Sequence, residues 1–212
     1  MNDTRPGFIE TIRWSEGRYH LLDLHSRRVA ETLEEMGWPQ VGNIRDWLPD
    51  VPDWLRNMTV KCRVLYGCGG PERVEFEPYT VRRVCSLRMV EGDNLDYHLK
   101  FADRSHLMAL RNRSMGADEV IVVKNGFVTD TSYSNLIFRT TDGFLTPAQP
   151  LLRGVMLRHL LDQGKVSSVA LRPEDILPEN RYGITDAFLI NAMLPPGSAN
   201  GVSVTDIKPI QS

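Results

Sequence analysis

The residue that stands out for its chemistry is a lysine. Lysine is scarce in this chain and occurs at Lys61, Lys100, Lys124, Lys165 and Lys208. Lys100 differs from the others because Leu99 and Phe101 flank it and because it lies just before an expected helix start. Apolar surroundings favour the neutral amine, which is the nucleophile that forms a Schiff base with a carbonyl compound. A lysine at a strand end with its amine in water fits the same pattern, so both interpretations stay open on this evidence alone.

Other kinds of chemistry lack support in the sequence. There is no glycine-rich nucleotide loop, no serine-hydrolase elbow and no zinc-protease motif, and the histidines and three cysteines have no metal-ligand spacing. We therefore predict no metal site. The formal net charge of −2 speaks against a nucleic-acid partner. The sequence has neither a secretory leader nor a long apolar run, which predicts a cytoplasmic protein that does not enter a membrane.

Strands and helices must position these residues, and the patterns for both are mixed along the chain. Alternation predicts a strand over Phe8 to Trp14 and another over Val81 to Met89. A helix is expected to begin near Asp23 as the capping residue. Asn125-Gly126 predicts a hairpin turn, because both residues tolerate positive φ. The predicted class is α+β, or mixed α/β.

The best candidate for a domain boundary is Pro78-Tyr79. It predicts a small N-terminal α/β domain over residues 1–79 and a larger domain over residues 80–212.

Several short motifs occur in an order and at spacings similar to those of one enzyme family. They are Lys100-Phe101-Ala102-Asp103-Arg104, Ser134-Asn135-Leu136-Ile137-Phe138, Leu151-Leu152-Arg153-Gly154-Val155-Met156 and Ile190-Asn191-Ala192-Met193-Leu194-Pro195, preceded by Glu10-Thr11-Ile12-Arg13 and His25-Ser26-Arg27-Arg28. Together they resemble the class IV aminotransferases, which are fold-type IV enzymes dependent on pyridoxal 5′-phosphate (PLP). This family includes branched-chain and D-amino-acid aminotransferases and aminodeoxychorismate lyases. The resemblance implies a shortened N-terminal domain and a larger, barrel-like domain that binds PLP.

The resemblance also implies roles for single residues in catalysis. Lys100 would hold PLP as a Schiff base and then act as acid and base at the substrate α-carbon. Asp130 would pair with the pyridine nitrogen and keep it protonated, at a position where most relatives have glutamate. Thr11 matches a threonine that the lyases place near the substrate.

Further matching residues would bind the rest of the cofactor. Gly154-Val155-Met156 would begin a helix whose N–H groups suit the phosphate dianion, a physical fit that does not depend on the resemblance. Asn191-Ala192 matches a second loop that contacts the phosphate. Arg28 matches an arginine that binds the phosphate from the smaller domain, and Leu152 matches an apolar residue against one face of the ring.

The resemblance leaves three functions open. The first is amino transfer between a small amino acid and a 2-oxo acid, and the second is aminodeoxychorismate lysis to 4-aminobenzoate and pyruvate. The third is a non-catalytic relative that still binds PLP. The family also implies a homodimer.

Overall fold

The computed structural model describes residues 6–197, 199 and 201–211. The described chain divides into two compact units. The first contains the residues up to Thr80 together with Leu99–Asp103, and the second contains Val81–His98 and the residues from Arg104 onward. Each unit is described by itself below. The division at residue 79 into functional domains stays a prediction.

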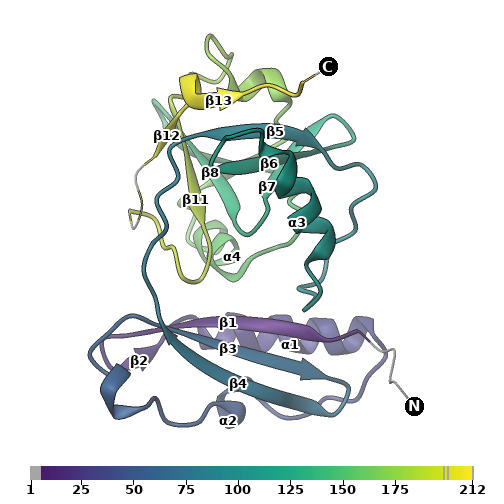
Figure 1. The fold of residues 1–212 in the computed structure, drawn as a ribbon, viewed down its shortest axis with the longest axis vertical. Helices are drawn as coiled ribbons and strands as arrows, with labels where there is room; N and C mark the ends of the chain where they lie inside the picture. Colours follow the sequence, from purple (N-terminus) through teal and green to yellow (C-terminus); the bar gives the residue numbers. More distant parts are fainter. Residues whose placement is uncertain (1–5, 198, 200, 212) are drawn as a thin grey trace. The chain divides into compact units, whose positions relative to one another are not determined.

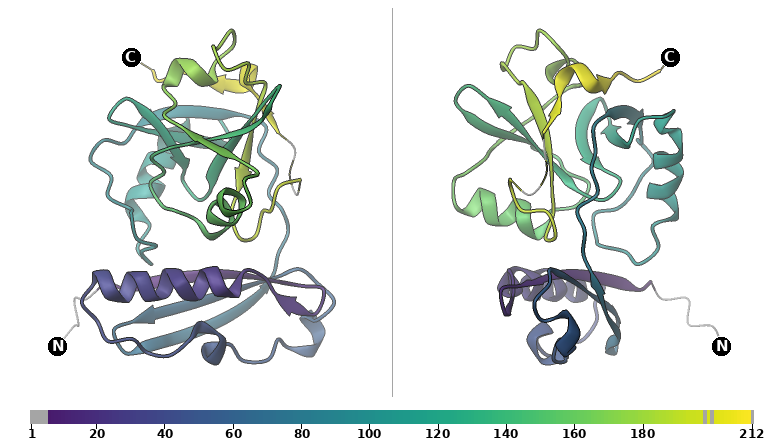
Figure 2. Two further views of the ribbon diagram at one scale, coloured as in Figure 1. Left: turned by 180° about the vertical axis from the view of Figure 1, so that it is seen from behind. Right: turned by 60° about the vertical axis from the view of Figure 1, so that its left-hand side comes forward.

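The first unit is an antiparallel sheet with a helix along it (Figures 1 and 2). Its strands, in the spatial order β2-β1-β3-β4, are β2 Arg18–Tyr19, β1 Phe8–Ser15, β3 Val60–Gly67 and β4 Gly70–Pro78. Its helices are α1 Leu22–Glu35, the single turn α2 Ile44–Trp47 and a 3-10 turn at Asp53–Leu55. The start of α1 differs from the sequence prediction, because Leu21 is the N-cap in a left-handed conformation and Asp23 lies in the first turn.

Alternation along β1 decides what the helix contacts. Phe8 and Ile12 are fully buried and pack with Val29 and Leu33 of α1 and with strand β3. Successive side chains of a strand point to opposite faces, so Glu10 shares the helix-facing side with these apolar residues. A carboxylate therefore lies inside the core of the first unit.

The segment Leu99–Asp103, which the predicted division assigns to the larger domain, belongs to the first unit. The backbone N–H of Ile9 donates to the carbonyl of Lys100 at 3.0 Å, and the N–H of Ala102 donates to the carbonyl of Gly7 at 2.8 Å. These bonds hold Lys100 beside the start of β1.

The second unit contains two sheets of described strands. One has the order β10-β9-β8-β11-β12, formed by Ser167–Val169, Gly143–Pro147, Asn135–Thr140, Asp186–Ile190 and Val202–Ser203. The other has the order β13-β5-β6-β7, formed by Ile207–Lys208, Leu87–Glu91, Glu119–Lys124 and Phe127–Thr131. The fold is mixed α+β, as predicted. The structure does not show the expected barrel, since these strands form two separate sheets.

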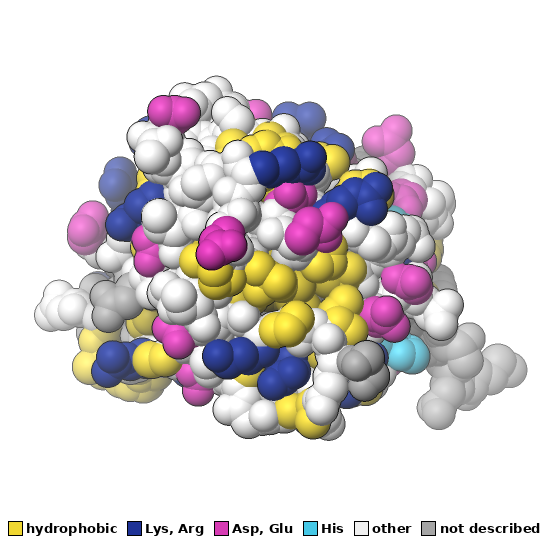
Figure 3. All heavy atoms as spheres, turned by 90° about the horizontal axis from the view of Figure 1, so that it is seen from above, with side chains coloured by type: hydrophobic (Ala, Val, Ile, Leu, Met, Phe, Trp, Pro, Cys, Tyr) yellow, Lys and Arg dark blue, Asp and Glu magenta, His cyan; other side chains and the backbone are white. Residues whose placement is uncertain are grey.

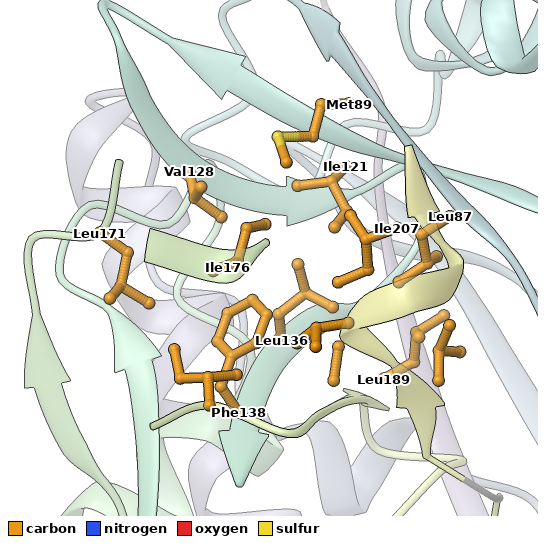
Figure 4. Close-up of a cluster of buried hydrophobic side chains, with 14 of the residues drawn as sticks. Leu87, Met89, Ile121, Val128, Leu136, Phe138, Leu171, Ile176, Leu189 and Ile207 are labelled. Carbon is orange, nitrogen blue, oxygen red and sulfur yellow. The ribbon is translucent and has the colours of Figure 1, made fainter. Parts of the chain in front are cut away.

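Apolar side chains from both sheets pack together in the second unit (Figure 4). Met89 and Ile121 come from one sheet, and Leu136, Phe138 and Leu189 come from the other. Val128 of β7 belongs to the same core, which therefore fixes β7, the strand that carries Asp130, relative to β8.

Helices and turns complete the second unit. They are α3 Ser105–Arg111, α4 Val155–Asp162 and 3-10 turns at Asn112–Ser114, Pro173–Ile176 and Val204–Asp206.

The predicted hairpin between β6 and β7 is confirmed, because Asn125 and Gly126 have φ values of 52° and 77°. The expected strand over Val81 to Met89 is wrong in its first part, since β5 begins at Leu87. The carboxylate of Asp118 accepts the N–H groups of Cys85 and Ser86 at 2.7 and 3.0 Å, which replaces strand pairing there.

The surface carries charges of both signs. On the face seen in Figure 3, hydrophobic side chains form a patch with Lys or Arg and Asp or Glu side chains around it. Among the described residues, no group of three or more histidine, cysteine or acidic side chains is arranged to hold a metal ion. No helix in the described ranges has the length and apolarity needed to cross a membrane.

Candidate functional site

The second unit holds a buried carboxylate, Asp130 on β7. Its side chain is linked to the loop before α4, because the N–H of Leu152 donates to Oδ2 of Asp130 at 3.0 Å. Nδ2 of Asn135, on β8, donates to Oδ1 of Asp130 at 2.8 Å and to the carbonyl of Leu152 at 2.8 Å. These bonds fix the carboxylate and the loop relative to each other.

Burial decides the ionisation of this carboxylate. Removal from water raises the pKa of Asp130 to about 7, although the hydrogen bonds from Leu152 and Asn135 act in the opposite direction. A buried carboxylate poised near neutrality is stabilised in its charged form when a cation lies beside it. Asp130 therefore fits a protonated ring nitrogen.

The same loop leads into an uncapped helix N-terminus. Gly154 is the N-cap of α4, and no side chain in the described part of the chain caps this helix. The first intrahelical bond runs from the N–H of Arg158 to the carbonyl of Gly154, so the N–H groups of Val155 and Met156 lie in the first turn and lack acceptors within the helix. Such a terminus fits a phosphate dianion.

Gly154 is required by close packing. A Cβ at this position would lie 2.2 Å from Oδ1 of Asn135. We predict that Gly154→Ala lowers PLP affinity by about tenfold or more. Asn135 must move to make room for the new Cβ, and it then loses its hydrogen bonds to Asp130 and to the carbonyl of Leu152. Equilibrium titration with PLP measures this change. Gly69→Ala is the matched control, since a Cβ there meets nothing within 4 Å; equal affinities of the two variants would contradict the prediction.

The loop at Asn191-Ala192 forms its own turn in the second unit. Oδ1 of Asn191 accepts the N–H groups of Met193 and Leu194 at 2.8 and 3.0 Å. Nδ2 of Asn191 donates to the carbonyl of Tyr133 at 3.4 Å. The side chain thus shapes the loop, and a phosphate contact from Asn191 or Ala192 stays a prediction.

In the first unit, Arg28 is part of a buried network. Its Nε and Nη2 atoms donate to Oε1 and Oε2 of Glu10 at 2.7 and 2.5 Å. His25, one turn earlier on α1, contacts Oε2 of Glu10 through Nδ1 at 2.5 Å. Burial would raise the pKa of Glu10, but the electrostatic interactions and hydrogen bonds with Arg28 and His25 outweigh burial and lower it to about 2. Glu10 is therefore an anion, and Nδ1 of His25 is the donor.

Lys100 interacts electrostatically with this network. Burial is the main cause that lowers the pKa of His25, Glu10 opposes the shift, and the positive charges of Arg28 and Lys100 add to it. Lys100 itself is half-buried. The first unit thus brings Lys100 and Arg28 into one charged group, whereas the half-buried Thr11 follows Glu10 on β1 and points to the opposite face of the strand.

Three residues of these networks, Glu10, His25 and Asn135, were quoted in the sequence motifs without a role. Glu10 had a detectable signal, because an acidic residue between Phe8 and Ile12 on the apolar face of a strand is unusual. No comparable local signal identifies the contact of Asn135 with Leu152, which is 17 residues away.

Comparisons with known proteins agree on one family. The model of the family "Amino-transferase class IV" matches residues 7–198. An uncharacterized protein of Haemophilus influenzae is 32% identical over 187 residues, covering 87% of this chain and 96% of that protein.

Solved structures have the same fold. A proposed 4-amino-4-deoxychorismate lyase from Haemophilus somnus has a TM-score of 0.79 at 27% identity, covering 90% of this chain and 97% of that one. A hypothetical aminotransferase from Mycobacterium tuberculosis in its PLP-bound form has a TM-score of 0.74 at 21% identity, covering 95% and 81%. The family match spans most of the chain, and we conclude that this protein belongs to the class IV aminotransferases.

Proposed function

We propose that this protein is a PLP-dependent aminotransferase that moves an amino group between a small amino acid and a 2-oxo acid. The observation that carries the proposal is the bond between Asp130 and the N–H of Leu152, which joins a buried carboxylate to the loop that leads into the N-terminus of α4. A ring with a protonatable nitrogen and a phosphate group is the ligand that such a pair suits. The proposal includes a homodimer, a cytoplasmic location and a barrel-like second unit.

Each residue has a task in the proposed reaction. When bound, PLP supplies an electron sink for the pair of electrons left at the substrate α-carbon. Asp130 holds a proton at the ring nitrogen, and Asn135 orients the carboxylate for that purpose. Nζ of Lys100 accepts the proton from the α-carbon and delivers it again. The amides of Val155 and Met156 and the guanidinium of Arg28 bind the phosphate. Leu152 packs against the ring, Asn191 and Ala192 shape the second phosphate loop, and Thr11 lies near the substrate.

Aminodeoxychorismate lysis is the second candidate. The likeness to the proposed lyase from Haemophilus somnus, at 27% identity over almost the whole of that chain, supports it. The motifs at residues 100–104 and 191–195, which resemble those of the lyases, support it as well. Transamination and lysis use the same cofactor-binding residues, so the products distinguish them.

Product analysis of the purified wild-type protein with PLP tests the proposal. We expect at least one amino acid from a panel of L- and D-forms to yield its 2-oxo acid in an amount equal to the enzyme, and to turn over when 2-oxoglutarate is added. Release of 4-aminobenzoate and pyruvate from aminodeoxychorismate, without amino transfer, would replace the first candidate by the second. PLP binding without either reaction would leave the third function, a non-catalytic relative.

A further inference from the structure

The carboxylate of Glu10 is buried in the core of the first unit. Its exposed fraction is 0%, and Phe8 and Ile12 lie on either side of it along the same face of β1. Two cationic or polar partners from α1 satisfy it, Arg28 through two nitrogens and His25 through Nδ1. Buried ion pairs of this kind contribute little net stability compared with apolar residues of similar volume. We therefore look for a function of this network other than stabilising the fold.

The geometry of the pair restricts the guanidinium of Arg28. Glu10 accepts from Nε and Nη2, which fixes the plane of the guanidinium and its position along α1. His25 holds Oε2 of the same carboxylate and so fixes the carboxylate in turn. Nε2 of His25 is buried and has no hydrogen-bond partner among the described residues.

We propose that Glu10 and His25 are positioning residues, which hold Arg28 in the orientation that binds the cofactor phosphate. This inference rests on the proposed function, because it takes the PLP phosphate as the anion bound by Arg28. Glu10 acts on the phosphate only through Arg28, and His25 acts through Glu10.

Positioning and simple electrostatics predict opposite effects when the charge of Glu10 is removed. A negative charge close to an anion site repels the phosphate, so its removal would tighten phosphate binding if charge alone mattered. If Glu10 positions Arg28, its removal weakens phosphate binding, because the guanidinium is no longer fixed. Glu10→Gln keeps the size of the side chain but turns an N–H donor toward the donors of Arg28 or His25.

The experiment compares the dissociation constants of PLP and of pyridoxal, which lacks the phosphate. For Glu10→Gln we expect PLP affinity to fall by about tenfold or more, the effect of losing charge-assisted hydrogen bonds, while pyridoxal affinity changes less than about twofold. Retained pyridoxal binding shows that the variant is folded. Arg27→Gln is the matched control on the same helix, since Arg27 is exposed and pairs with Glu31. In an Arg28→Gln background, Glu10→Gln is expected to change neither constant further.

Should Glu10→Gln fail to fold, His25→Leu tests the same network. It removes the contact to Oε2 and is expected to lower PLP affinity about threefold, again with little change for pyridoxal. Equal losses for PLP and pyridoxal, tighter PLP binding, or an undiminished effect in the Arg28→Gln background would overturn the positioning role and leave the proposed function standing. Absence of PLP binding by the wild-type protein would overturn both.

Discussion

Lys100→Ala is expected to lower the rate of amino transfer by at least about 10³-fold, because one side chain provides both the covalent link to the cofactor and the proton transfer at the α-carbon. The phosphate-binding residues are unchanged in this variant, so PLP still binds, though more weakly and without a covalent link. Single-turnover assays with an amino donor measure the rate, and equilibrium dialysis measures the bound PLP.

Lys165→Ala is the matched control for this prediction. Lys165 is exposed and follows the glycine after α4, so its loss is expected to leave the rate within about twofold of wild type. A Lys100→Ala variant that retains a substantial fraction of the wild-type rate would contradict the assignment of Lys100.

The second large effect is expected for Asp130→Asn, which removes the negative charge that holds a proton on the ring nitrogen. The rate of amino transfer is expected to fall by about 10²-fold or more, as for other losses of a charge that acts in the transition state. PLP stays covalently bound, because Lys100 and the phosphate-binding residues are unchanged. Stopped-flow measurement of the half-reaction with an amino donor checks the rate. A rate equal to that of wild type would show that Asp130 has no role in the reaction.

The stability of the cofactor-free protein provides an independent test of the same carboxyl. The pKa of Asp130 is raised by burial from 3.8 to about 7 in the folded state, so the folded protein holds this proton more tightly than the unfolded chain does. Stability from this group is therefore present below about pH 4 and is lost as the pH rises through about 7. Asn does not titrate, so Asp130→Asn should gain stability relative to wild type between pH 5 and pH 8, by up to a few kcal/mol. Denaturant unfolding of wild type and Asp130→Asn at pH 5 and at pH 8 measures this gain. A stability difference between the two proteins that is the same at both pH values would contradict the prediction.

Local signals in the sequence predicted several elements well. Asn125-Gly126 marks a hairpin because both residues adopt positive φ at low cost, and the structure has this turn. In this turn the neighbouring residues alone determine the conformation. Gly154 at the start of α4 is different, because the side chain that leaves no room for a Cβ there belongs to Asn135 on strand β8.

Other features depend on contacts that are distant in sequence. The return of Lys100 to the first unit requires backbone pairing with Gly7 and Ile9, more than 90 positions earlier. Alternation predicts a strand at Cys85, but its backbone N–H donates a hydrogen bond to the carboxylate of Asp118, 33 residues away. The partners of Glu10 become apparent only when α1 packs on β1. Tertiary packing of this kind leaves no short motif, which is why the candidate site was predicted residue by residue but its two hydrogen-bonded networks were not.

Reductive trapping tests the central claim most directly. The wild-type protein is incubated with PLP, treated with borohydride, digested, and examined by peptide mass spectrometry. We predict one modified peptide that carries the reduced pyridoxyl group on Lys100, and none in the Lys100→Ala variant. A modification on another lysine, or no stable modification at all, would contradict the account.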